Sequence, residues 1–200
     1  MVAEEVYPEI KGSELRMYGM IHKAARELVL QAHGEAVWDR VAAAANIQDD
    51  HLISGEHYDD AVTLAAINAI SEEIRTPVPE LLEVFGEYWI GFTGTTAYAS
   101  FLDMSGDDLP SFLENLDRLH TSVKATMPQA DMPSFQVLRS TAAEIEVLYA
   151  SNREGLETFV KGLLKGLLAR FGETGEVVFS EAADGVRFII QRNTSAQAAA

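Results

Sequence analysis

The chain has 200 residues, of which 48% are hydrophobic, so it is long enough to bury the core of one domain or of two closely packed lobes. Its 31 acidic and 15 basic residues give a formal net charge of −16, which argues against nucleic acid or an anionic membrane surface as the main partner. The chain has no cysteine, which excludes disulfides, thiolate catalysis and cysteine-bound metal sites, and which fits a cytoplasmic protein.

Helical periodicity dominates the N-terminal part of the chain. Residues 1–16 come before it; they are polar and aperiodic, and we expect a flexible extension rather than a signal peptide. Apolar residues then recur three and four positions apart, with Gly34 as a helix stop and Pro79 suited to a first helical turn. This pattern predicts helices over 17–33, 35–46, 60–74, 80–93 and 109–127. No apolar run is long enough to cross a bilayer, so a soluble protein is expected.

Beyond Pro133 the hydrophobic period changes toward two, which is typical of strands. Four strands in two hairpins are predicted, at 135–140, 143–150, 177–180 and 186–191. The stretch 153–171 between the hairpins is helical in pattern, and the alanine-rich end, 193–200, is expected to be disordered. Helices followed by an antiparallel four-stranded sheet with one helix predict an α+β fold.

The stretch Tyr149–Glu154 spans the end of a predicted strand and the start of a predicted helix. Ser151 and Glu154 match a capping box, in which each side chain bonds the backbone amide of the other residue. Arg153 would then lie in the first helical turn, where the free amides already favour an anion. A bound anion would resolve this conflict. In an extended stretch Tyr149, Ser151 and Arg153 point the same way and can offer two hydroxyls and a guanidinium to one acidic group.

His120 lies on the apolar stripe of the predicted 109–127 helix. A histidine in such a place is most often a core residue bonded to a backbone carbonyl. A buried imidazole on a rigid helix is also the usual way to place an axial nitrogen on haem iron. The residues alone leave both interpretations open.

The other histidines and the carboxylates carry weaker signals. His22 is expected on the polar face of its helix, and His33 at a helix end, both in structural roles. His51 and His57 lie in an acidic loop that we interpret as solvated rather than as a metal site. Catalytic and nucleotide-binding motifs are missing from the sequence, so an enzyme is not predicted.

Several short segments together resemble the haem nitric oxide/oxygen-binding (H-NOX) family, the sensor type also found in soluble guanylate cyclase. The signature Y-x-S-x-R corresponds to Tyr149-Ala150-Ser151-Asn152-Arg153. The other matching segments, in the family's order, are Met17–Gly19, Gly34–Trp38, Asn115–His120, Pro133–Phe135 and Arg153–Leu156. The resemblance covers residues 17–192 and implies a bacterial, stand-alone gas sensor.

The resemblance implies one domain that holds haem b between a distal helical lobe, 17–84, and a proximal α/β lobe, 85–192. It implies that His120 is the axial ligand and that Pro133 presses on the porphyrin. It also implies that Tyr149, Ser151 and Arg153 bind the haem propionates, so that Arg153→Ala should weaken haem retention more than the fold. The remaining residues expected in the haem pocket are Ile21, Trp89, Met104, Leu116 and Thr158.

The resemblance also implies which gas is sensed. Members that bind oxygen carry a distal tyrosine five positions after the signature arginine, where this chain has Thr158. A short hydroxyl does not replace a phenol as donor to bound oxygen. Trp89 occupies a place where such members keep an amide. We therefore expect a sensor of nitric oxide, with carbon monoxide as a further ligand, that excludes oxygen or binds it poorly.

The resemblance also implies how the signal is produced. Nitric oxide binding releases His120, after which the 109–127 helix relaxes and the haem flattens against Pro133. The chain lacks kinase and cyclase motifs, so a separate histidine kinase or cyclic-di-GMP enzyme is the expected signalling partner. The residues alone also allow a haem-free α+β module that binds a small ligand or a protein. In that module Ser151 and Glu154 only cap a helix and His120 packs in the core.

Overall fold

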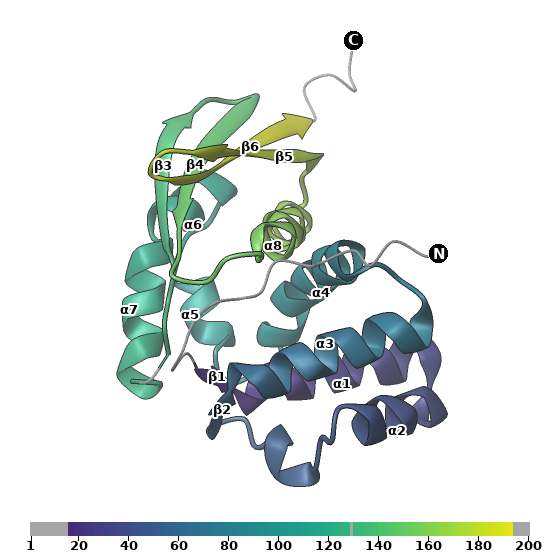
Figure 1. Ribbon diagram of the computed structural model, residues 1–200. Helices are drawn as coiled ribbons and strands as arrows, with labels where there is room; N and C mark the ends of the chain where they lie inside the picture. The colour runs from purple at the N-terminus through teal and green to yellow at the C-terminus, as the bar shows by residue number, and fades with distance from the viewer. Residues whose placement is uncertain (1–15, 129, 194–200) are drawn as a thin grey trace.

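The computed structural model describes residues 16–128 and 130–193, so the predicted extension up to residue 15 and the predicted tail from residue 194 lie outside it. Helices α1 (Gly19–His33), α2 (Glu35–Ala44) and α3 (Asp60–Ile74) form the N-terminal layer, and a four-stranded antiparallel sheet forms the other end of the molecule. Figure 1 shows α4 (Val78–Thr93) and α8 (Glu157–Arg170) between the two. The predicted α+β class is confirmed.

The N-terminal helices begin and end where the sequence places their signals. Gly34 ends α1 with a φ of 84°, a conformation that glycine adopts without strain. Asp59 caps α3, because its side chain accepts a hydrogen bond from the Ala61 amide. Met17, expected in the first helix, instead belongs to β1 (Arg16–Tyr18), which pairs with β2 (His57–Asp59). The loop expected at 49–60 also contains a short 3-10 helix, η1 (Asp49–Leu52).

The predicted 109–127 helix is two helices, α6 (Leu109–Glu114) and α7 (Leu116–Thr126), preceded by the short α5 (Ala99–Asp103). Asp108 caps α6, in a capping box with Ser111. The break comes at Asn115, whose side-chain amide donates to the Ser111 carbonyl at 2.9 Å. Asparagine competes for helix carbonyls in this way, and apolar spacing alone does not reveal the break.

The sheet has the order β3-β4-β6-β5, with all neighbours antiparallel. Its strands are β3 (Ser134–Ser140), β4 (Glu144–Ala150), β5 (Thr174–Ala182) and β6 (Gly185–Asn193). Ile145, Val147 and Tyr149 alternate along β4 and are buried, which follows from a strand with one face on the core. Both predicted hairpins are confirmed, and the predicted tail loses Asn193 to β6.

Helices α4 and α8 cross with their backbones in contact. A Cβ on Gly162 would lie 2.0 Å from the Glu83 carbonyl oxygen, and one on Gly86 would lie 2.2 Å from that of Phe159. Glu83 also pairs with Lys161 and Lys165, at 2.8 and 2.5 Å. The lobe boundary expected at residue 84 falls inside α4.

Candidate functional site

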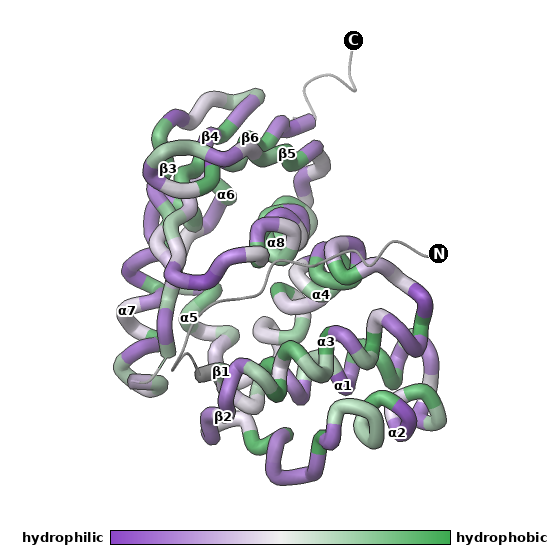
Figure 2. Tube along the Cα trace, in the orientation of Figure 1, coloured by the Kyte–Doolittle hydropathy of each residue, from purple (hydrophilic) through white to green (hydrophobic). Residues whose placement is uncertain are grey.

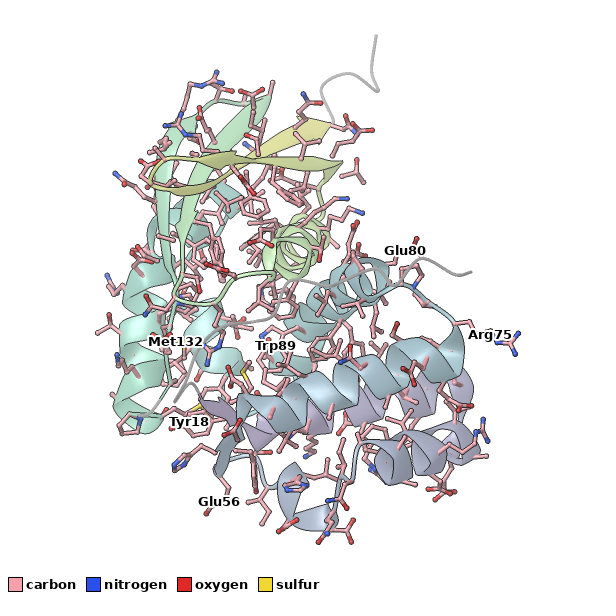
Figure 3. The ribbon with its side chains drawn as sticks, in the orientation of Figure 1. Tyr18, Glu56, Arg75, Glu80, Trp89 and Met132 are labelled. Atoms are coloured by element: carbon pink, nitrogen blue, oxygen red, sulfur yellow. The ribbon has the colours of Figure 1, made fainter. Side chains whose placement is uncertain are left out.

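An apolar cavity of about 380 Å³ lies between the helical layer and the sheet part. Its walls come from α1, α3, α4, α7 and α8. Figure 3 shows Trp89 and Met132 in this region, whereas Arg75 projects away at the far end of α3. Eight of the predicted site residues line the cavity: Ile21, Trp89, Leu116, His120, Pro133, Tyr149, Ser151 and Arg153.

His120 faces the cavity from α7 and is held by the segment before β3. Its Nδ1 lies 3.0 Å from the carbonyl oxygen of Pro133, and because a carbonyl only accepts, Nδ1–H is the donor. The neutral ring therefore carries its lone pair on Nε2. Burial lowers the pKa of His120, and the bond to Pro133 opposes this only in part. The result is a neutral imidazole in the tautomer that ligates a metal through Nε2.

Asp117 fixes the position of α7 against the sheet. Its carboxylate accepts from the Phe135 amide and from the Ser134 hydroxyl, both at 2.7 Å. Asp117 lies three residues before His120, so both side chains face the same segment from one side of the helix. The three-residue spacing between Asp117 and His120 is the feature of the sequence that points to this role of Asp117.

Tyr149 and Ser151 bring two hydroxyls to the edge of the cavity. Tyr149 is 3% exposed; burial raises the pKa of its phenol, and a hydrogen bond with the Ser151 side chain acts in the opposite direction. Ser151 also accepts from the Arg153 amide at 3.0 Å. Figure 2 shows the connection from β4 to α8 as hydrophilic, so a polar edge borders an apolar cavity.

The predicted capping box in this connection is wrong. Helix α8 begins at Glu157, and its N-cap residue is Leu156, without a side-chain cap. Gly155 has a φ of 79°, which a helical residue does not adopt, so the helix cannot extend back through this position. Ser151 bonds within the connection instead. Arg153 therefore lies ahead of the helix, and the supposed conflict with the helix amides does not exist.

Arg153 is buried, at 9% exposure, and has anionic and carbonyl partners inside the protein. Its Nε donates to Asp60 Oδ2 at 3.2 Å, and its Nη1 donates to the Asp131 carbonyl oxygen at 2.9 Å. Asp131 Oδ2 lies 3.8 Å from the same nitrogen. No sequence pattern points to Asp60, which is 93 positions away from Arg153. Asp60 and Asp131 are thus part of the arginine's surroundings.

Met104 and Thr158 do not line the cavity, which corrects two predicted pocket residues. Met104 follows α5 on the surface and is 69% exposed. Thr158 lies one position before Phe159, which does line the cavity, and one helical step turns a side chain by about 100°. The face of α8 toward the cavity is apolar and consists of Phe159, Val160, Leu163, Leu164 and Leu167.

His22 is buried, at 1% exposure, rather than on the polar face expected for it. Its Nδ1 donates to the His51 carbonyl at 2.9 Å, so its Nε2 accepts from the Thr63 hydroxyl at 2.8 Å. His22 and Thr63 both line the cavity. Within 16–128 and 130–193, histidine and carboxylate side chains form no group of three arranged to hold a metal ion.

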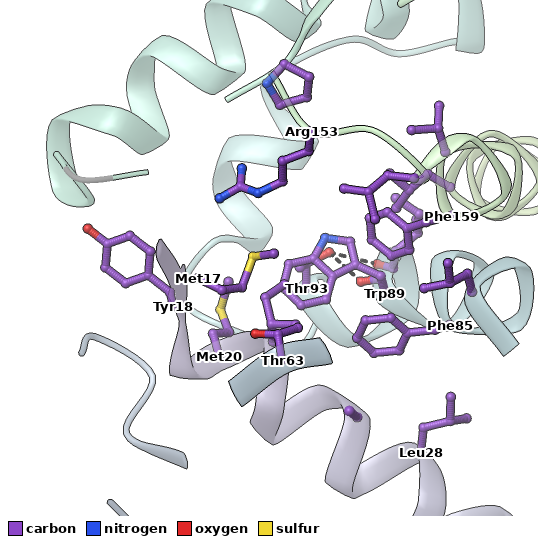
Figure 4. Close-up of a pocket in the computed structure, with 18 of the residues that line it drawn as sticks. Met17, Tyr18, Met20, Leu28, Thr63, Phe85, Trp89, Thr93, Arg153 and Phe159 are labelled. Atoms are coloured by element: carbon purple, nitrogen blue, oxygen red, sulfur yellow. Dashed lines mark hydrogen bonds between the residues drawn. The ribbon is translucent and has the colours of Figure 1, made fainter. Parts of the chain in front are cut away.

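These residues fit haem. The cavity is apolar enough for the porphyrin, a neutral imidazole offers Nε2 for the iron, and two hydroxyls and a buried guanidinium lie at one polar edge. Figure 4 shows Trp89 and Phe159 in this cavity, with Arg153 at its border. Among the residues that the structure describes, no helix is long and apolar enough to cross a membrane.

Solved H-NOX structures share this fold. A triple mutant of an H-NOX protein from S. oneidensis, in the Fe(II) state, gives a TM-score of 0.80 at 17% identity and covers 89% of this chain and 97% of that chain. The unliganded Fe(II) H-NOX protein from K. algicida gives a TM-score of 0.74 at 22% identity and covers 88% of this chain and 97% of that chain. The IWP-051-bound H-NOX protein from Shewanella woodyi, in the Fe(II)CO state, gives a TM-score of 0.74 at 25% identity and covers 89% of this chain and 95% of that chain.

Sequence relatives lead to the same family. Soluble guanylate cyclase gcy-35 of Caenorhabditis elegans is 29% identical over 165 residues, which are 81% of this chain and 24% of the relative. Soluble guanylate cyclase 89Db of Drosophila melanogaster is 21% identical over 155 residues, which are 78% of this chain and 23% of the relative. The chain thus spans about a quarter of the length of these relatives. The family model described as Haem-NO-binding matches residues 18–178. The chain therefore belongs to the H-NOX family of haem-NO-binding domains.

Proposed function

We propose that this chain binds haem b in the cavity, with His120 as the axial ligand. Tyr149, Ser151 and Arg153 would hold the propionates. Ile21, Trp89, Leu116 and Pro133 would pack against the porphyrin. The observation that carries the proposal is the bond from His120 Nδ1 to the Pro133 carbonyl, which leaves a neutral Nε2 lone pair beside an apolar cavity.

The proposed ligand is nitric oxide, with carbon monoxide as a second ligand and oxygen excluded or bound poorly. Ferrous haem, when bound, would supply an iron that takes up these gases, and His120 would be the residue that holds this iron. The cavity face of α8 offers no phenol. The hydroxyls of Thr63 and Thr93 are both committed, since Thr63 donates to His22 and Thr93 donates to the Trp89 carbonyl at 2.8 Å. These contacts leave the α8 face and the two threonine hydroxyls without a donor for bound oxygen, which supports the proposed selectivity at these positions.

The proposed output is a movement of α7 after His120 is released. Asp117 ties this helix to Ser134 and Phe135, and His120 itself bonds Pro133, so a shift of α7 would reach the start of β3. H-NOX domains are sensors and are not themselves catalytic. A separate histidine kinase or cyclic-di-GMP enzyme is the proposed receiver, in the cytoplasm.

The absorbance spectrum of protein expressed with haem available tests the first step. A Soret band that shifts when nitric oxide is added to the reduced protein is the expected result. A chain that takes up no haem would instead favour the haem-free binding module. The signalling step is tested by measuring the activity of the partner. The partner is mixed with the unliganded ferrous protein, with its nitric oxide form or with a His120→Gly variant. Equal activity in all three cases would contradict signalling through His120.

A further inference from the structure

An ion pair joins Arg153 to Asp60, the first residue of α3. Arg153 Nε lies 3.2 Å from Asp60 Oδ2, and the two side chains are only 8% and 13% exposed. Asp60 belongs to the helical layer, whereas Arg153 belongs to the connection between β4 and α8. A buried guanidinium is costly without such a partner, so the pair determines where Arg153 lies.

A second contact fixes the other side of the guanidinium. Arg153 Nη1 donates to the carbonyl of Asp131, two residues before Pro133, whose own carbonyl accepts from His120. Arg153 therefore bridges α3 to the segment that holds the proposed axial ligand. Figure 4 shows the Arg153 side chain extending from the β4–α8 connection to the side of the cavity where Met17 lies.

The carboxylate of Asp60 is not needed to begin its helix. Asp59 caps α3, with its Oδ1 at 2.8 Å from the Ala61 amide. Asp60 Oδ1 is buried and has no hydrogen-bond partner among the described residues, which costs free energy. A buried acid that caps nothing and leaves one oxygen unpaired suits a role in holding Arg153.

We propose that Asp60 is a positioning residue of the haem site, which holds Arg153 Nε and so fixes the direction in which the guanidinium meets the propionates. The inference rests on the proposed function. Arg153 lies in an irregular connection, where a long side chain loses rotamer freedom when it binds a ligand. Asp60, fixed in the first turn of a 15-residue helix, removes part of that cost in advance.

The test measures how fast haem leaves the holoprotein for an excess of apomyoglobin. Asp60→Ala removes the acceptor for Nε, so haem loss is expected to be roughly tenfold faster. Asp60→Asn keeps an oxygen acceptor in the same place and should stay within about threefold of wild type. Asp59→Asn is the matched control: it removes the neighbouring charge, still caps the helix and should leave haem loss unchanged.

Two further measurements separate positioning from stability. In an Arg153→Gln background Asp60→Ala should add no further haem loss, because Asp60 acts through the arginine. In the haem-free protein Asp60→Ala should speed amide exchange in residues 151–155, whose Arg153 side chain it anchors.

Three results would overturn the inference in a wild-type chain that holds haem. Asp60→Ala could lose haem no faster than wild type, its effect could add to that of Arg153→Gln, or Asp60→Asn could lose haem as fast as Asp60→Ala. A wild-type chain that takes up no haem would instead overturn the proposed function.

Discussion

The Nδ1 atom of His120 lies 3.0 Å from the carbonyl oxygen of Pro133, and this contact sets which ring nitrogen faces the cavity. We therefore expect His120→Gly to lose haem on gel filtration and to regain it when imidazole is supplied, because free imidazole can fill the space left in the wall. His57→Ala, in β2 and outside the cavity lining, is the control and should keep haem. Haem retention by His120→Gly without imidazole would contradict the assignment of His120.

The helices and strands followed from sequence wherever the signal was local. Gly34 ends a helix, and two-residue alternation marks β4. Boundaries failed where a side chain competed with the helix, as Asn115 does, or where a glycine turned the chain, as Gly155 does. Neither event changes apolar spacing, which was the signal used.

The site was predictable from sequence in part, because the resemblance identified residues but not their neighbours. Eight predicted residues line the cavity, yet Asp60 could not be found from a pattern, since it meets Arg153 across 93 positions. Thr158 was expected in the pocket because it lies five positions after Arg153. The direction of a side chain on a helix depends on where the helix begins. Helix α8 begins at Glu157, four residues after the predicted start at Arg153.

Removing Arg153 should weaken the fold as well as haem binding. Arg153→Ala leaves the Asp60 carboxylate, 13% exposed, without its counter-charge, and breaking such a pair from one side costs about 3 kcal/mol. Arg153→Ala with Asp60→Asn removes both charges and should recover part of that loss. Urea unfolding of the haem-free proteins measures both free energies. Equal stability of the single and double variants would show that the pair does not support the fold.

The crossing of α4 and α8 depends on Gly86. A Cβ there would lie 2.2 Å from the Phe159 carbonyl oxygen, so Gly86→Ala should separate the helices and destabilise the protein by about 2 kcal/mol or more. Gly91→Ala, in the same helix, meets nothing within 4 Å and should stabilise it by roughly 0.5 kcal/mol or more through helix propensity. Thermal unfolding of the two variants tests the contrast, which fails if both shift the midpoint alike.

The buried His22 makes stability depend on pH. Burial is the main cause that lowers its pKa below 6.5, and the groups facing it are His51, Tyr58 and Asp60. The folded state therefore binds a proton less readily than the unfolded state. Stability is full above pH 6.5 and is lost as the pH falls from there toward the folded pKa, by up to about 1.4 kcal/mol per pH unit.

Replacing His22 with leucine separates this effect from other titrations. His22→Leu should be less stable near neutral pH, by about 1–3 kcal/mol, because Thr63 and the His51 carbonyl lose their partner. It should also lose less stability than wild type between about pH 7.5 and about pH 5.5. Urea unfolding at both values gives the comparison. Parallel pH profiles would show that His22 does not titrate in this range.

Trp89 is expected to act on haem through its bulk rather than as a donor to the gas. Figure 4 shows its indole nitrogen on the side of the ring toward Arg153, which lies at the border of the cavity. Trp89→Phe should therefore leave the reduced protein unable to hold oxygen in air, as in wild type, and should leave the C–O stretching frequency of the carbon monoxide form unchanged.

Trp38→Phe is the matched control for Trp89→Phe, because Trp38 is buried at 5% exposure in the core of the helical layer and does not line the cavity. Both variants should give wild-type spectra with carbon monoxide, and Trp89→Phe alone should lose haem faster, since only Trp89 packs in the cavity. A wild-type protein that holds oxygen, together with a Trp89→Phe variant that does not, would make the indole the gas-facing donor. Because hydroxyls such as those of Thr63 and Thr93 are committed elsewhere, that outcome would place oxygen selectivity on α4 rather than on α8.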